Sequence, residues 1–593
     1  MLVNNIYKFI YIIILISSNI LFVYYTHITN SINISNEKIE KSKMNSLIKE
    51  NFFIIESTNL NEISSNMYGY AISKKGIITN NYYKRLGKYE EPEPLGVYIL
   101  IRRNGNIIQI NQDYYGSYGL YIYENKEYFA ISNSFLLLAE HLRGNKSMTF
   151  NKDFADNLII SGLCSPSIYE SLIEEINKIP SNSFIIINVI EKNYKINYID
   201  QQRYTIPFES EDGLKIIDRW VDKWGYIFRS LKKKTDNISM DLSGGFDTRA
   251  VLSILYNSGI DLKDILIHSI NNNVHNHEED FRIATNISSK LGLKLNNKKL
   301  DDKGTIFDIN NTLDLTMYTK LGFHKEFYFK NKFFMKPRFT FTGGWGEMLR
   351  GYPNKPIQEY INDIISQSRN IWNYKKEFSD SSKRILKRSI NRLKYERNYS
   401  NDYEVSIDLY LRGRGINHFG KASVESFLAN EYRLEPLSDP DIKKLKISNN
   451  ESSLHNLIAY IYVRFSPVLI TVPFEGNRIL NKESIKNAEN LNNKIFPYKI
   501  KSDYNKDFFI DVKRKSPVNP SKYIPKINEY LKEMFQRKDF FLSINPIYNK
   551  SVYNWAKKYS ETSNYFPLRH FNALLAISKV LGDFSKNKRN KRV

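Results

Sequence analysis

The fold of the larger part of this chain is decided by the stretch Asp241-Leu242-Ser243-Gly244-Gly245-Phe246-Asp247-Thr248, at the end of an apolar run. Two consecutive glycines let the backbone turn tightly and approach a ligand closely. Ser243 and Thr248 add hydroxyl groups, and a helix beginning at Asp247 would direct its first N–H groups to the same place. The stretch therefore predicts a strand, an anion-binding loop and a helix, in that order.

The same loop excludes two common classes of nucleotide-binding protein. It lacks the lysine and the spacing of a Walker A loop, and it lacks the third glycine of a dinucleotide-binding fingerprint. Neither a kinase-like ATPase nor a dehydrogenase is expected.

Patterns on either side of the loop divide the chain into two halves. From Asp212 onward helical periodicity dominates, and apolar strands at 238–242, 265–270 and 339–342 interrupt it, as in a parallel sheet wrapped by helices. From Asn51 to about Asp200, short β-branched and aromatic runs alternate with turn residues. The fold class expected is therefore α+β over 51–200 and α/β over 212–580. Strands are expected at 96–102, 107–110, 119–123 and 184–189, with a helix over 153–160.

Composition limits the classes of protein to consider. Of the 593 residues 42% are hydrophobic and 14% aromatic, which is ample material for a core. The single cysteine, Cys164, excludes an intramolecular disulfide and any multi-cysteine metal site. The net charge of +23 is spread along the chain, so we expect a charged surface rather than nucleic-acid binding. The most basic block, 382–397, is expected to form a solvated helix.

The N-terminus contains 17 mostly apolar residues, Phe9 to Tyr25. No small-x-small cleavage site follows them, so segment 1–30 predicts a membrane anchor rather than a signal peptide, with 31–50 as a linker. Lysines after this run outnumber the single Lys8 before it, which places the main body in the cytoplasm. A translation start at Met44 is the alternative. At the other end, 581–593 is expected to be a basic tail.

Ser243 to Thr248 resembles the SGGxD(S/T) pyrophosphate loop of the ATP pyrophosphatase (PP-loop) family, whose fold is that of the adenine-nucleotide alpha hydrolases. In that family the loop holds the β- and γ-phosphates of ATP while a substrate attacks the α-phosphate. Three more stretches are similar to the asparagine synthetase branch. They are Thr342-Gly343-Gly344-Trp345-Gly346-Glu347 with Arg350-Gly351-Tyr352, the segment Val472 to Arg478, and Lys513-Arg514-Lys515.

The first half resembles the glutaminase domain of the same family. The similarity lies in Gln112 to Gly116, Leu120 to Tyr123, Phe129 to Ser132 and the turn Ile179-Pro180-Ser181. It implies an Ntn-hydrolase-like sandwich. A working glutaminase of this type needs a cysteine at the mature N-terminus, and none is present. We therefore expect a degenerate remnant, as in β-lactam synthetase-like proteins, with Cys164 as a small core residue.

The resemblance implies ATP and Mg²⁺ as cofactors. Lys515 would stabilise charge on the acyl-adenylate, with Lys513 as the alternative. Asp247 and Glu347 would bind Mg²⁺, and Glu347 is also counted as catalytic. Reading the second loop back from Tyr352 would put Gly346 at that position instead, but a metal held against a triphosphate favours two carboxylates. The residues expected to bind ATP are Ser243, Gly244, Gly245, Asp247, Thr248, Ser269 and Gly343.

Several other residues have two interpretations each. Glu347 could instead cap a helix, and Asp280 could be the N-cap of a helix over 281–291 or a substrate-side acid. Trp345 could close over a ligand or pack. His275 and His277 form an HxH pair that fits a solvated turn better than a metal site. Arg412, Arg414 and His418 could bind an acidic substrate group or pair with Glu431 and Glu435.

Taken together, the sequence predicts an ATP-dependent, amide-forming ligase of the asparagine synthetase type. It would adenylate a small-molecule or peptide carboxylate, release pyrophosphate, and transfer the acyl group to ammonia or an amine. Two alternatives remain: an RNA-modifying PP-loop enzyme and a non-catalytic ATP-binding scaffold.

Overall fold

A computed structural model of the chain describes residues 44–161, 167–199, 203, 205–271, 277–301, 304–306, 309–321, 332–350, 353, 355–369, 375–399, 401–446, 455–511, 574 and 577–580. Met1–Glu50 and Asn51–Val593 are separate units. Of the first unit only the helical residues 44–50 are described, so the expected anchor lies outside the described residues, as does the expected basic tail. Among the described helices, none has both the length and the apolar composition that crossing a bilayer requires.

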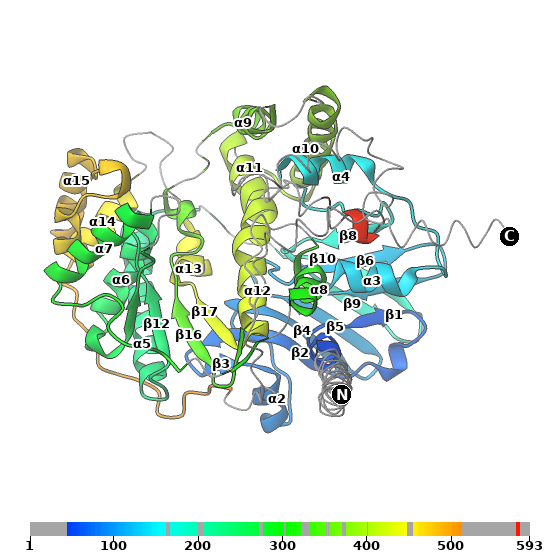
Figure 1. Ribbon diagram of the computed structural model, residues 1–593, viewed down its shortest axis with the longest axis horizontal. Helices are drawn as coiled ribbons and strands as arrows, with labels where there is room; N and C mark the ends of the chain where they lie inside the picture. The colour runs from blue at the N-terminus through cyan, green and yellow to red at the C-terminus, as the bar shows by residue number, and fades with distance from the viewer. Residues whose placement is uncertain are drawn as a thin grey trace, which may run out of the picture. The chain divides into compact units, whose positions relative to one another are not determined.

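The second half of the chain is built on a four-stranded parallel sheet in the order β13-β12-β16-β17 (Figure 1). Its strands are β12 (Ile238–Asp241), β13 (Leu266–His268), β16 (Arg338–Phe341) and β17 (Glu431–Leu434). The expected strands over 238–242, 265–270 and 339–342 are confirmed within two residues at each end. Because β13 lies on one side of β12 and β16 on the other, the direction of winding reverses between β12 and β16. In open parallel sheets ligands bind at such a point, beyond the carboxyl ends of the strands.

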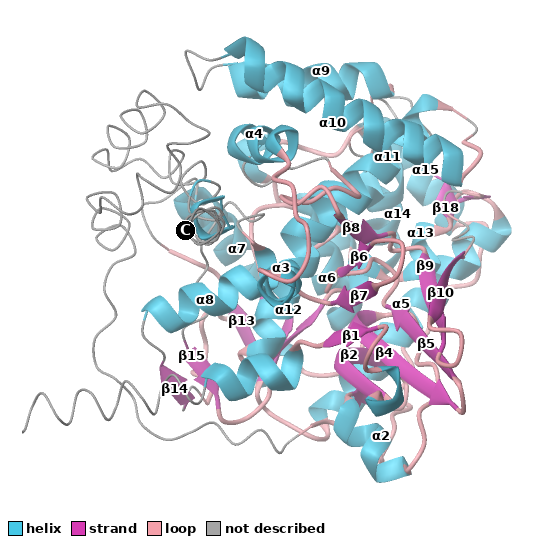
Figure 2. Ribbon diagram, turned by 90° about the vertical axis from the view of Figure 1, so that its right-hand side faces the viewer, coloured by secondary structure: helices cyan, strands magenta, loops and turns pink. Residues whose placement is uncertain are grey.

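Helices lie around this sheet (Figure 1), and Figure 2 shows the molecule from the side of the first half. Phe228 of α5 packs edge to face on Phe341 of β16, which is completely buried. The helices are α5 (Glu211–Lys232), α6 (Phe246–Tyr256), α7 (His277–Lys290), α8 (Ile309–Lys320), α9 (Ile357–Arg369), α10 (Lys375–Glu396), α11 (Asp402–Leu409), α12 (Lys421–Leu428), α13 (Pro440–Lys443), α14 (Asn456–Phe465) and α15 (Lys482–Asn492). A π-helical segment, Tyr410–Gly420, joins α11 to α12. Short strands β11 (Ile206–Pro207) and β18 (Leu445–Lys446) pair in parallel, and β14 (Gly304–Ile306) and β15 (Lys332–Phe334) pair antiparallel.

The first half contains two antiparallel sheets, in the orders β10-β9-β5-β4-β2-β3 and β1-β7-β6-β8. The strands are β1 (Ile54–Glu56), β2 (Asn66–Ser73), β3 (Gly76–Ile78), β4 (Gly96–Asn104), β5 (Ile107–Gln112), β6 (Leu120–Glu124), β7 (Phe129–Ser132), β8 (Ile176–Ile179), β9 (Ser183–Asn188) and β10 (Asn193–Tyr198). The helices are α2 (Asn80–Leu86), α3 (Phe135–Leu142) and α4 (Lys152–Ser161). The strand-rich α+β organisation and the helix over 153–160 are confirmed. The chain is thus a mixed α/β protein with parallel and antiparallel sheets.

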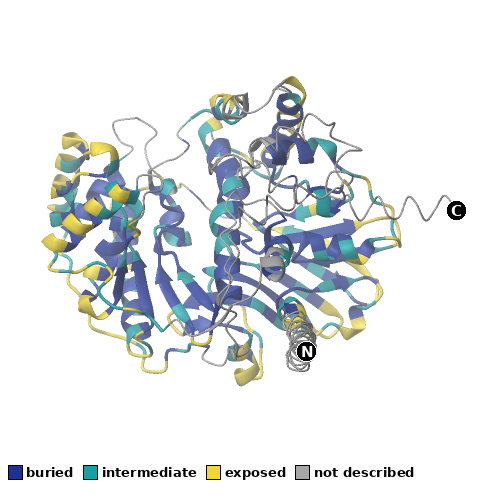
Figure 3. Ribbon diagram, viewed as in Figure 1, coloured by how far each residue is buried: buried dark blue, intermediate teal, exposed yellow. Residues whose placement is uncertain are grey.

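The two halves share a hydrophobic core, and buried residues lie on both sides of their junction (Figure 3). Tyr115 of the first half stacks on Trp345 of the second, with ring centroids 3.9 Å apart. The Tyr115 hydroxyl donates to the Ser438 carbonyl at 3.0 Å, and the Tyr70 hydroxyl donates to the Arg433 carbonyl at 2.8 Å. These contacts attach the first half directly to β17 and to the loops that follow β16 and β17.

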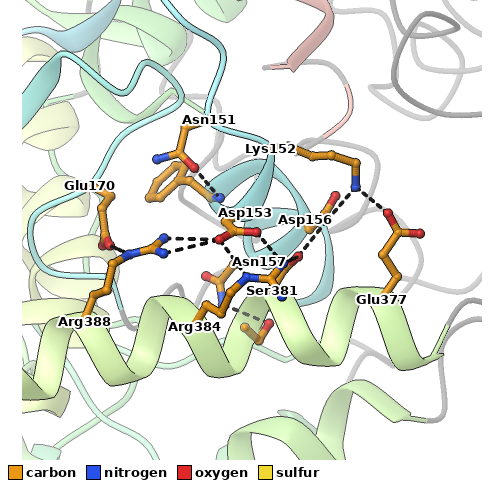
Figure 4. Close-up of polar contacts among 12 residues, drawn as sticks. Asn151, Lys152, Asp153, Asp156, Asn157, Glu170, Glu377, Ser381, Arg384 and Arg388 are labelled. Carbon is orange, nitrogen blue, oxygen red and sulfur yellow. Dashed lines mark hydrogen bonds and ion pairs between the residues drawn. The ribbon is translucent and has the colours of Figure 1, made fainter.

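The basic helix α10 is not simply solvated, as the sequence predicted, because it packs along α4 of the first half (Figure 4). Arg384 binds both carboxylate oxygens of Asp153, at 2.9 and 2.6 Å, and Arg388 bridges Asp153 and Glu170. Asp156, which is fully buried, accepts from Ser381 and Lys152. The periodic arginines therefore neutralise acidic residues of α4 and its neighbouring loop.

Candidate functional site

The loop after β12 carries most of the residues expected to bind ATP. The Ser243 backbone N–H donates to the Thr248 hydroxyl at 3.1 Å, and the two hydroxyl oxygens also lie 3.1 Å apart. The Gly245 N–H donates to Ser243 Oγ at 3.3 Å. Gly245 is the N-cap of α6 and has no side chain to cap the first N–H groups of that helix. The Ser243 and Thr248 hydroxyls therefore stabilise the conformation of the loop. The N-terminal end of α6, where Gly245 offers no side-chain cap, is the part of the loop that favours an anion.

Gly244 is tied to three other segments of the second half. Its N–H donates to Asp280 Oδ1 at 2.7 Å, and its carbonyl accepts from the Glu475 N–H and from Arg249. Since α7 begins at His277, Asp280 lies in the first turn of that helix, and the interpretation of Asp280 as N-cap is wrong. Its carboxylate instead accepts a hydrogen bond from the backbone N–H of Gly244. The loop therefore accommodates an anionic oxygen.

Arg249, on the second turn of α6, is fully buried and binds mainly carbonyl oxygens. It donates to Val472 and Pro473, each at 2.6 Å, and more weakly to Leu469. Its guanidinium carbon also lies 3.7 Å from the centroid of the Phe474 ring. Arg249 thereby holds the segment around 472–478, which the resemblance singled out, beside the glycine loop.

The second glycine-containing loop, which follows β16, contacts the first loop directly. A Cβ atom on Gly343 would lie 2.9 Å from the Thr248 nitrogen, and one on Gly346 would lie 2.2 Å from Asp247 Cγ. A larger residue at Gly343 would press on the backbone of α6, and one at Gly346 would displace the Asp247 side chain. The expected ATP-binding residues Gly343 and Asp247 are therefore neighbours, although 96 residues separate them in the chain.

Trp345, in the middle of the second loop, packs into the core. It has a positive φ of 68°, is fully buried, and donates its indole N–H to Glu435 Oε2 at 3.1 Å. With Tyr115 stacked on its ring, it fixes the path of the loop. Of the two interpretations of Trp345, packing is the one observed.

A cavity of about 590 Å³ opens at the carboxyl ends of the sheet. It runs from Ser243 and Ser269 past Thr342 to charged residues on β17 and α12. Both signs of charge are present, because Arg433 and Glu431 line the cavity, and Thr340 donates to Glu431 at 3.0 Å. A cavity of this size, with converging polar groups, is the default candidate for a small-molecule site.

Ser269 directly follows β13 and lines the cavity, but its backbone groups are already bonded. Its N–H donates to Asn296 Oδ1 at 3.3 Å, and its carbonyl accepts from the Asn296 amide at 3.1 Å. His268 lies 3.5 Å from Asp241, and His277 lines the same cavity from α7. The structure thus brings Ser269 to the site, with its main chain held by Asn296.

Asp247 and Glu347, the expected Mg²⁺ ligands, come from the two loops that touch each other. Asp247 lies against the Gly346 backbone, one residue before Glu347. Among the described residues, the buried Glu347 Oε2 has no hydrogen-bond partner. Such an atom fits a carboxylate shaped for a cation, and Mg²⁺ typically uses one or two carboxylates together with substrate phosphates. Within the described residues no cluster of three or more His, Cys, Asp or Glu could hold a metal by itself.

Lys443 is a further ionisable residue beside the loop that follows β16. It ends α13, is 1% exposed, and donates to the Trp345 carbonyl at 3.3 Å. Burial lowers the pKa of Lys443 to about 7, an effect that Arg203 reinforces and that the nearby carboxylates of Glu347 and Asp247 oppose. The side chain of Lys443 therefore reaches the loop that carries Glu347.

From the sequence, Arg412 has two interpretations, binding of an acidic substrate group or pairing with Glu431 and Glu435. It binds Glu396 at 2.9 Å and the Tyr169 hydroxyl at 3.0 Å, so the second of these interpretations is wrong for Arg412. His418 is half-buried in the same π-helical segment, where desolvation, Arg414 and Arg433 lower its pKa to about 3. These residues support the helical bundle rather than the cavity, although Arg433 lines the cavity from β17.

Several expected residues lie outside the described residues. They are the catalytic candidate Lys515 with its alternative Lys513, the core candidate Cys164, His275, and the Gly351-Tyr352 end of the second loop.

No known protein family matches this chain, and no curated protein matches it. The geometry also contains residues that sequence reasoning missed, notably Arg249 and Lys443, and it shows that Glu435, considered above only as a partner of the arginines, accepts from Trp345. One signal was available for Glu435. Glu431, Arg433 and Glu435 alternate along a strand that is otherwise apolar, which indicates a polar face of the sheet. Nothing in the local sequence marks Arg249 or Lys443, whose partners are distant in the chain.

Proposed function

We propose that the chain is an ATP-dependent, amide-forming ligase of the asparagine synthetase type. One observation carries this proposal. The loops after the neighbouring parallel strands β12 and β16 meet where the winding of the sheet reverses, with Gly343 and Gly346 packed on Asp247 and Thr248. This is where a parallel sheet binds its ligand, and both loops are the ones that resemble the family.

The finer fold assignments belong to the same proposal. The order β13-β12-β16-β17 with a glycine loop before α6 supports a PP-loop domain over 212–580. The antiparallel sheets between 51 and 200 support an Ntn-hydrolase-like remnant. Since the single cysteine of the sequence, Cys164, lies inside the stretch 51–200 and not at its start, we propose ammonia or an amine, and not glutamine, as the nitrogen donor.

In this function the residues of the two loops bind and orient the triphosphate. The uncapped N-terminal end of α6 would face the phosphate oxygens, and Arg249 and Asp280 hold Gly244 in place. Mg²⁺, when bound by Asp247 and Glu347, would neutralise charge on the phosphates. The remaining cavity, toward Arg433 and Glu431, leaves room for the carboxylate that attacks the α-phosphate.

We further propose that the catalytic portion works in the cytoplasm, where ATP is available, with residues 1–30 as a possible link to the membrane. No nucleic acid partner is proposed. Both points rest on the sequence arguments given above.

The function is tested by product analysis. Purified protein is incubated with Mg²⁺, ATP, a panel of amino acids and dicarboxylic acids, and hydroxylamine, which captures acyl-adenylates as hydroxamates. We expect AMP and pyrophosphate in equal amounts, together with a hydroxamate. Stoichiometric ADP and phosphate would overturn the proposal. Absence of Mg²⁺-dependent binding of a non-hydrolysable ATP analogue would overturn it as well and would favour a different role for the cavity.

A further inference from the structure

A second cavity, of about 630 Å³, is lined by residues of both halves of the chain. It shares no lining residue with the cavity at the carboxyl ends of the parallel sheet. The charged residues of its lining are three arginines and two carboxylates: Arg203, Arg397, Arg412, Glu396 and Asp408. Three positive and two negative charges leave this described lining with a net charge of +1 at neutral pH.

Two of the three arginines pair with the two carboxylates. Arg203 binds Asp408 at 2.7 Å, and Arg412 binds Glu396 at 2.9 Å. Arg397 lies 3.7 Å from Asp408, which is beyond hydrogen-bond distance, and its side chain is 25% exposed. The unbalanced charge of the cavity therefore belongs to Arg397, the residue that follows α10.

Arg412 adds an unsatisfied donor to this lining. Its side chain is 4% exposed, and its Nη2 donates to Glu396 and to the Tyr169 hydroxyl. Its Nε has no hydrogen-bond partner among the described residues. Buried polar groups are nearly always paired, so a cavity that contains such a donor indicates an acceptor from outside the chain. An anion would satisfy this donor and also balance the charge of Arg397, which a water molecule would not do.

We propose that this cavity binds a small organic acid, whose carboxylate is held by Arg397 and Arg412. Planar guanidinium groups match the geometry of a carboxylate, and hydrogen bonds between the two are about twice as strong as those between neutral groups. Tyr198, Ile199 and Thr205 would contact the remainder of the acid. Because the two cavities have no lining residue in common, this site does not depend on the proposed function.

The test titrates the full chain with lactate and succinate by isothermal titration calorimetry, with lactamide and succinamide as neutral counterparts. Inorganic phosphate is titrated separately, because arginines also bind phosphate, although phosphate has no carbon skeleton to contact Tyr198 and Ile199. We expect at least one of the acids to bind in a ratio of one molecule to one chain. Its amide and phosphate should bind at least about tenfold more weakly.

Charge variants locate the bound acid. Arg397→Gln removes the unbalanced charge at a partly exposed position and should weaken binding by at least about fivefold. Glu396→Gln removes a negative charge from the lining and should strengthen binding. The matched control is Lys394→Gln on the same helix, because Lys394 pairs with Asp402 at 3.3 Å and is not among the lining residues. This control should leave the affinity unchanged.

Equal affinity of each acid and its amide, or of phosphate and the acids, would overturn the proposal. So would loss of acid binding in Arg433→Gln, in the other cavity, with unchanged binding in Arg397→Gln, because the acid would then lie at the proposed ATP site. None of these measurements requires the chain to release pyrophosphate. The acid site and the ligase activity are therefore tested separately.

Discussion

Two turns of this molecule each hold a carboxylate with a buried oxygen after a strand, and the surroundings of the two carboxylates differ. Asp113, after β5, accepts from the backbone N–H groups of Tyr115, Ser117 and Tyr98 and from the Ser117 hydroxyl. Glu347, after β16, has a buried oxygen without a hydrogen-bond partner among the described residues. A carboxylate satisfied by its own turn stabilises that turn, whereas one left with an open oxygen is available to a ligand.

The largest expected effect is a loss of activity when Asp247, which contacts the turn after β16, is changed. Asp247→Asn removes a charge from the proposed metal site and leaves the size of the side chain unchanged. We expect pyrophosphate release to fall by at least about 100-fold, while the free energy of unfolding changes by less than about 1 kcal/mol, because the glycine contacts of Asp247 remain. Initial rates and urea unfolding measure the two quantities. A variant with full activity would remove Asp247 from the metal site.

The next effect is a loss of stability, and it concerns the turn that holds Asp113. Asp113→Ala leaves three buried N–H groups and a hydroxyl without their acceptor. We expect the free energy of unfolding to fall by roughly 3 kcal/mol. The activity of the molecules that remain folded should be retained.

Ser117→Ala serves as the graded control, because it removes only the hydroxyl donor to Asp113. It should cost roughly 1 kcal/mol in urea unfolding. If Asp113→Ala were no less stable than Ser117→Ala, the turn would not depend on the carboxylate.

Most of the sheet could be predicted from the sequence, because its strands are short apolar runs that end in glycine or polar residues. Carboxyl ends of parallel strands share one edge, so the meeting of Gly343 with Asp247 follows from two local patterns. Lys443 and Arg249 could not be found in this way. Their environments depend on tertiary packing: Lys443 reaches a carbonyl 98 residues away, and Arg249 reaches carbonyls more than 200 residues away.

The misjudged helix α10 shows the same limit. Its spacing of arginines correctly indicated a charged face, but the acids that this face meets, Asp153 and Glu170, lie more than 200 residues earlier in the chain. Arg412 likewise meets Glu396 because the π-helical segment turns it toward α10. Local sequence patterns indicate which face of a helix is charged, but they do not indicate which element of the fold that face contacts.

The pH dependence of stability gives a smaller effect at the first turn. Burial raises the pKa of Asp113 to about 6, although its hydrogen bonds act in the opposite direction. The unfolded chain releases this proton near pH 4, so the contribution is fully present below that pH and is lost as the pH rises to about 6. Asp113→Asn, which does not titrate, should lack this loss. Urea unfolding at intervals from pH 4 to pH 7 measures the difference, and parallel curves for the two proteins would contradict the shift.

The smallest effect is expected for a carboxylate at the surface, Asp153 of α4. Arg384 holds the pKa of Asp153 below its usual value, mainly through the paired hydrogen bonds of its guanidinium group. Because the pair is partly exposed, Asp153→Asn should lower the free energy of unfolding by only about 0.5–1 kcal/mol, and less at high salt. The sign of the pH dependence is opposite to that of Asp113: the contribution is present above about pH 4 and is lost as the pH falls through the lowered pKa. Lys383→Gln, on the same helix and 3.8 Å from Asp380, is the control and should change almost nothing. A loss of several kcal/mol in Asp153→Asn, or any loss of pyrophosphate release, would mean that the α4–α10 contact supports the site as well as the surface.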